Sequence, residues 1–75
     1  MAKGTHDPRY QALIAKLAEA RKGAGLSQTE LAAKLGQRQQ FVSKYESGER
    51  RLDVIEFVDV ANALALDLSP LLRGS

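Results

Sequence analysis

The sequence contains no cysteine, no tryptophan and a single histidine among its 75 residues. Without cysteine the chain can form neither a disulfide nor a thiolate metal site, so packed aliphatic side chains or oligomerisation must stabilise it. No stretch approaches the roughly 18 apolar residues of a membrane span, and no signal peptide opens the chain. We expect one small domain with no cofactor, no metal ion and no membrane partner. The lack of cysteine also fits a cytoplasmic location.

Groups that could perform catalysis are equally scarce. The only histidine, His6, lies in the opening segment MAKGTH, which has no periodicity and is expected to be a mobile arm. Ser27 and Ser43 therefore have no histidine base within a structured region, and no glycine-rich phosphate cradle is present. The sequence argues against an enzyme.

The formal net charge of +2 hides an uneven distribution. Residues 1–51 hold ten lysines and arginines against five acidic residues, whereas residues 52–75 hold Arg73 against four acidic residues. A basic part of this kind favours a polyanionic partner, although two ordinary solvated surfaces would give the same pattern.

Start and stop signals divide the chain into five expected helices, and no segment shows the alternation of a strand. Asp7 and Pro8 open the first helix. Ser27 and Glu30 form a capping box at the start of a second, short helix, which Gly36 closes in a left-handed conformation. A third helix is expected at about residues 39–47 and a fourth after Asp53.

The last expected helix opens at Asp67 or Ser69, followed by Pro70. The chain is therefore predicted to be an all-α domain over residues 7–72, with a flexible arm at 1–6 and a tail at 73–75.

The second and third helices, joined across Gly36, have the spacing of a helix-turn-helix. The stretch LSQTELAAKLGQRQQFVSKYESGERR resembles the phage repressor and Cro-type helix-turn-helix family, also called XRE-type. The matching positions are Leu26-Ser27-Gln28, Glu30-Leu31-Ala32, Leu35-Gly36, Val42-Ser43, Glu46, Gly48, Val60-Ala61 and Ala63-Leu64.

The resemblance covers roughly residues 10–72 and implies a five-helix bundle of the lambda-repressor type. It further implies a regulator, expected to be a repressor of bacterial or phage genes, that inserts its third helix into the major groove of double-stranded DNA.

In this family the start of the third helix faces base edges, which here means Gln39 and Gln40. A glutamine amide can pair with N6 and N7 of adenine, although exposed glutamines are often ordinary surface residues. Ser43 and Lys44 lie one turn further on the same face. Lys44 could donate to guanine or to a phosphate, and Ser43 could serve only to allow close approach.

Four further residues are expected to contact phosphates: Gln28, Arg38, Arg50 and Arg51. By resemblance Gln28 contacts the DNA backbone and could brace Gln39; the alternative is a plain first-turn residue. Arg38 stands where the family usually has a serine or threonine cap, which either a phosphate contact or surface drift explains. Arg50 and Arg51 are expected to clamp the flanking backbone, which contributes affinity rather than sequence preference.

Arg21 and Glu46 are expected on inward faces of the first and third helices. A charge on such a face is costly unless it is paired. We therefore predict that the two side chains form a structural ion pair, as the resemblance also implies.

Phe41 stands where the family often has a small polar residue, and could pack against the domain or touch a thymine methyl group.

Leu52, Ile55, Leu68, Leu71 and Leu72 could form a self-complementary patch for a homodimer, or simply turn inward. A second hypothesis is an antitoxin-like module whose main role is to hold a protein partner.

Overall fold

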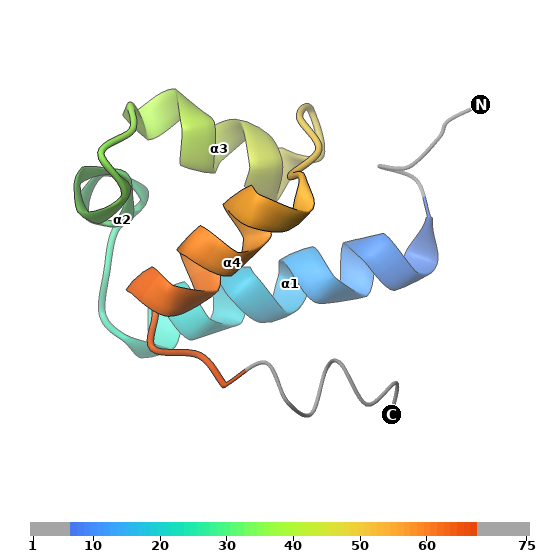
Figure 1. The fold of residues 1–75 in the computed structure, drawn as a ribbon, viewed down its shortest axis with the longest axis horizontal. Coiled ribbons are helices and arrows are strands. Elements are labelled where there is room, and N and C mark those ends of the chain that lie inside the picture. The colour runs from blue at the N-terminus through green and yellow to red at the C-terminus, as the bar shows by residue number, and fades with distance from the viewer. Residues whose placement is uncertain (1–6, 68–75) are drawn as a thin grey trace.

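The computed structural model describes residues 7–67, and within them it contains four helices and no strand (Figure 1). These are α1 (Pro8–Gly23), α2 (Gln28–Leu35), α3 (Gln39–Ser47) and α4 (Val54–Ala63). The all-α class is therefore confirmed, and residues 7–67 contain four helices. The predicted arm at 1–6, the last helix around Pro70 and the tail at 73–75 lie outside the described residues. So do Leu68, Leu71 and Leu72.

The first residues of each helix explain where three of the helices begin. The Asp7 carboxylate accepts from the Arg9 amide at the start of α1. At α2 the capping box is complete, because the Glu30 amide donates to Ser27 Oγ (3.0 Å) and the Ser27 amide donates to Glu30 Oε1 (2.8 Å). The start of α4 has the same arrangement with Asp53 as the cap and Glu56 as its partner. Each box satisfies amides that the helix itself leaves free.

Glycines in the left-handed region end α2 and α3. Gly36 has φ +68° and Gly48 has φ +88°. A Cβ at Gly36 would meet no atom within 4 Å, so the constraint at the turn is backbone conformation rather than space. For a residue other than glycine, this left-handed conformation costs about 1 kcal/mol or more of conformational free energy.

The core forms where all four helices meet. Figure 1 shows α2 end-on and α3 from the side, so the two helices of the turn are steeply inclined to each other. The buried cluster is Ile14, Leu17, Leu31, Ala32, Val42, Tyr45, Leu52 and Val60. Leu52 is only 5% exposed, which corrects its assignment to a surface patch. Within residues 7–67 no helix is long and apolar enough to cross a membrane.

The predicted pair between Arg21 and Glu46 is present and joins α1 to α3. Arg21 Nε donates to Glu46 Oε2 at 2.8 Å, and Arg21 Nη2 donates to Glu46 Oε1 at 3.2 Å. The two side chains are only 10% and 11% exposed. Arg21 Nη1 also donates to the Leu26 carbonyl at 2.7 Å, so the same guanidinium holds the loop before α2. The hydrogen bond with Glu46 raises the pKa of Arg21 and keeps it charged.

The two tyrosines of the domain differ in what their hydroxyls do. The Tyr10 hydroxyl accepts a hydrogen bond from the Leu52 amide at 2.9 Å and so ties the loop before α4 to α1. The Tyr45 hydroxyl is fully buried and has no hydrogen-bond partner among the described residues. Burial, reinforced by the charge of Glu46, raises the pKa of Tyr45.

These two hydroxyls give a matched pair of substitutions. Tyr10→Phe should lower the free energy of unfolding by about 1 kcal/mol, because it leaves the Leu52 amide without its acceptor. Tyr45→Phe should leave stability unchanged or raise it, because no hydrogen bond within the domain is lost. Urea unfolding of both variants measures the difference, and equal losses would contradict the assignment of the Tyr10 bond.

The ion pair between α1 and α3 makes a second prediction. Arg21→Ala should lower the free energy of unfolding by about 3 kcal/mol, because Glu46 would remain buried without its cation. Arg50→Ala is the control, since Arg50 pairs with Glu56 at a more exposed site and its loss should cost less. If Arg21→Ala costs less than about 0.5 kcal/mol, or no more than the control, the pair does not hold the two helices together.

Candidate nucleic-acid interface

The outward face of α3 carries the four residues that the sequence assigns to base contacts. Gln39, Gln40 and Lys44 are exposed and Ser43 is half-buried. The opposite face of α3 carries Val42 and Tyr45, both 0% exposed, which fix the rotation of the helix about its axis. The buried face thus determines which side chains remain available to a partner.

Gln28, the first residue of α2, is bonded on both sides by residues of α3. Gln39 Nε2 donates to Gln28 Oε1 at 2.9 Å, so the expected brace between these glutamines is present. Gln28 Nε2 in turn donates to Glu46 Oε1 at 3.0 Å. Gln28 is therefore more than a plain first-turn residue, and its link to Glu46 is a contact that the sequence analysis did not anticipate.

Cationic side chains surround a hollow beside α3. The hollow is open and has a volume of ≈ 630 Å³; it is lined by Arg38, Gln40, Phe41, Lys44, Arg50 and the turn residues Gly36 and Gln37. Arg38 occupies the N-cap position of α3 with an extended backbone and makes no capping hydrogen bond. Its guanidinium is therefore not used to close the helix.

Arg50 is held by α4 rather than projecting freely from the loop. Its Nη1 and Nη2 donate to the two carboxylate oxygens of Glu56 at 2.9 and 2.7 Å, and its guanidinium lies 4.9 Å from the centre of the Phe41 ring. The hydrogen bonds from Arg50 and from the Asp53 amide lower the pKa of Glu56 to about 2. Arg50 therefore has a structural role that the sequence analysis did not predict.

Phe41 packs against the domain, which is the first of the two alternatives that the sequence left open. It is half-buried against the core, and its ring meets the Tyr45 ring edge-on at 5.6 Å between centroids. The Arg50 guanidinium covers another part of the ring. Phe41 is thus a support for α3 and for Arg50.

Arg51 is exposed and is positioned by an aromatic ring. Its guanidinium carbon lies 4.8 Å from the centre of the Tyr10 ring, within the range of a cation–π contact. Because the Tyr10 hydroxyl also accepts from the Leu52 amide, one tyrosine orders this part of the loop through both its ring and its hydroxyl.

The exposed apolar surface at the start of α4 differs in part from the predicted patch. Ile55 is 69% exposed, as a surface position requires, and its neighbour Val54 is 76% exposed. Val54, the first residue of α4, was not among the residues of the predicted patch. Leu52 does not contribute, because it is part of the core.

Comparison with known proteins agrees with this geometry. The helix-turn-helix family matches residues 17–71 of the chain. Among solved structures, an XRE-family like protein from Pseudomonas syringae pv. tomato str. DC3000 superposes with a TM-score of 0.84 and is 56% identical; the match covers 91% of this chain and 83% of that one. No curated protein matches the chain. The chain belongs to the XRE-type helix-turn-helix family of DNA-binding transcription regulators.

Proposed function

We propose that the protein is a transcriptional repressor that binds a specific sequence of double-stranded DNA as a homodimer and inserts α3 into the major groove. The observation that carries the proposal is the pair of exposed glutamines at the start of α3, of which Gln39 is held in place by Gln28. A palindromic site would then present the same bases to both copies of α3. The place of action would be the cytoplasm, where bacterial or phage DNA lies.

Gln39, Gln40, Ser43 and Lys44 would face the base edges. Each glutamine amide combines a donor and an acceptor, the combination that adenine presents in the major groove. Lys44 would donate to guanine or to a nearby phosphate, and the short Ser43 would let the helix approach the bases closely.

Arg38, Arg50, Arg51 and Gln28 would contact phosphates on either side of the reading helix. The hollow beside α3 supports this arrangement, since Arg38, Lys44 and Arg50 line it together. At Gln28 the start of α2 offers free backbone amides as well as the side chain, and helix N-termini favour phosphate. Such contacts would set affinity and orientation rather than sequence preference.

The homodimer would use the exposed pair Val54 and Ile55 on α4. The same pair supports the second candidate function, an antitoxin-like module that holds a different protein. The two are separated by measuring the mass of the purified protein in solution, free and bound to DNA. A dimer on DNA supports the repressor, whereas a monomer that does not bind DNA favours the partner-binding module.

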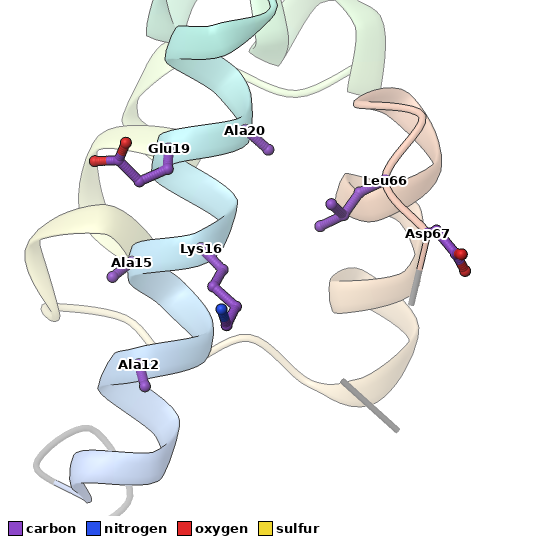
Figure 2. Close-up of a pocket in the computed structure, with 7 residues that line it drawn as sticks. All are labelled: Ala12, Ala15, Lys16, Glu19, Ala20, Leu66 and Asp67. Atoms are coloured by element: carbon purple, nitrogen blue, oxygen red, sulfur yellow. The ribbon is translucent and has the colours of Figure 1, made fainter. Parts of the chain in front are cut away.

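A separate groove, with a volume of ≈ 750 Å³, lies between α1 and the residues that follow α4 (Figure 2). Its lining includes three alanines of α1 together with Lys16, Leu66 and Asp67, and no residue of α2 or α3. The proposed DNA contacts therefore do not involve this groove.

The base contacts can be tested on a site obtained by selection from random duplexes. Gln39→Ala and Gln40→Ala should each weaken binding to that site by about 1–3 kcal/mol while barely changing binding to unrelated DNA. Asn62→Ala, which removes an exposed amide from α4, is the control and should change neither affinity. Equal losses on the selected and unrelated duplexes would remove the base-reading role of the two glutamines.

The phosphate contacts make a different prediction. Arg51→Ala should weaken binding to all duplexes alike and reduce the slope of log affinity against log salt by about 1, because fewer counterions are released. Lys16→Ala removes a cation from the α1 groove instead and should leave the slope unchanged. Titrations at several salt concentrations measure both slopes; an unaltered slope in Arg51→Ala would argue against a phosphate contact.

A further inference from the structure

Four side chains form a continuous chain of hydrogen bonds from the core to the reading face of α3. Arg21 donates to Glu46, Gln28 donates to Glu46 at 3.0 Å, and Gln39 donates to Gln28 at 2.9 Å. The chain begins at side chains that are about one-tenth exposed and ends at Gln39, which is exposed. A buried ion pair and a proposed base-reading residue are thus linked through one intervening amide.

Chemistry fixes the direction of every bond in this chain. A guanidinium can only donate, and a carboxylate that is paired with it can only accept. Gln28 must therefore present its NH2 group to Glu46, which leaves its carbonyl oxygen toward Gln39. Gln39 can only donate to that oxygen, so one of its two N–H groups is occupied.

The remaining groups of the Gln39 amide are one N–H donor and the carbonyl acceptor. Adenine presents the complementary pair, the N7 acceptor and the N6 donor, whereas guanine presents two acceptors, N7 and O6. A glutamine with both N–H groups free could donate twice to guanine. Occupation of one N–H by Gln28 therefore favours adenine over guanine.

We propose that Glu46, acting through Gln28, is a positioning residue that fixes the Gln39 amide and thereby sets a preference for adenine over guanine at the base pair that Gln39 contacts. The inference rests on the proposed function, in which Gln39 reads a base. Gln40 provides an internal comparison, because its side chain is exposed and makes no hydrogen bond with the described residues. Its base preference should not depend on Glu46 or Gln28.

The first test replaces Gln28 by methionine, an unbranched side chain of similar length without a strong donor or acceptor. Gln39→Ala and Gln40→Ala first identify the base pair that each glutamine reads on the selected site. Gln28→Met should then lower the ratio of affinities for adenine and guanine at the Gln39 position by about tenfold and leave the ratio at the Gln40 position unchanged. Ratios are used because a lost phosphate contact would lower both affinities equally.

The second test reverses the direction of the chain. In Glu46→Gln, the new side-chain amide must turn its oxygen to Arg21 and its NH2 group to Gln28. Gln28 would then accept with its side-chain oxygen and donate with its NH2 group to the side-chain oxygen of Gln39. Both N–H groups of Gln39 would then face the base, and the preference should move from adenine toward guanine. Thermal unfolding of both variants checks that they are folded, and Gln28→Met alone decides the matter if Glu46→Gln is not.

Each outcome separates the inference from the function on which it rests. If Gln39→Ala alters no base preference, the proposed base contact is wrong, and the positioning role is wrong with it. If Gln39→Ala abolishes the preference but Gln28→Met leaves the ratio unchanged, only the positioning role is overturned. A purely structural role for Glu46 is the conclusion if Glu46→Gln weakens binding to every duplex by one common factor.

Discussion

The ion pair between Arg21 and Glu46 is the interaction on which the arrangement of α3 depends. It joins α1 to α3, and the same guanidinium bonds the Leu26 carbonyl before α2. The same carboxylate also accepts from Gln28 at the start of α2. One pair of side chains therefore contacts α1, α3 and the segment that leads into α2.

Stability by itself does not explain why this position is charged. The desolvation of two buried charges offsets much of their attraction, and well-packed apolar side chains of similar volume often stabilise as well or better. Apolar contacts, however, have no donor or acceptor and cannot orient a neighbouring amide. The Glu46 carboxylate can only accept from Gln28, so it gives the Gln28 amide a single arrangement. Under the proposed positioning role, this orienting effect is the reason for a charge at this position.

Local signals account for the part of the fold and site that could be predicted from the sequence. The caps at Asp7, Ser27 and Asp53 and the glycine at position 36 act within a few residues of where they stand, so their effects can be read without knowing the tertiary structure. The pair of Arg21 and Glu46 was also predictable, because opposite charges on two inward faces have few other ways to be satisfied. The XRE-type pattern then placed the second and third helices in their functional context.

Residues around the loop before α4 could not be placed in this way, because the path of a loop follows from contacts that no periodicity describes. Leu52 turns inward where Tyr10 bonds its amide, and Arg50 turns toward Glu56. The latter contact bears on DNA binding. A guanidinium has five N–H groups. In Arg50, three hydrogen bonds go to Glu56 and to the Arg51 carbonyl, which leaves two N–H groups for the proposed phosphate contact. Because Glu56 already pairs with its charge, the proposed phosphate contact of Arg50 should contribute less to the salt dependence of binding than that of Arg51.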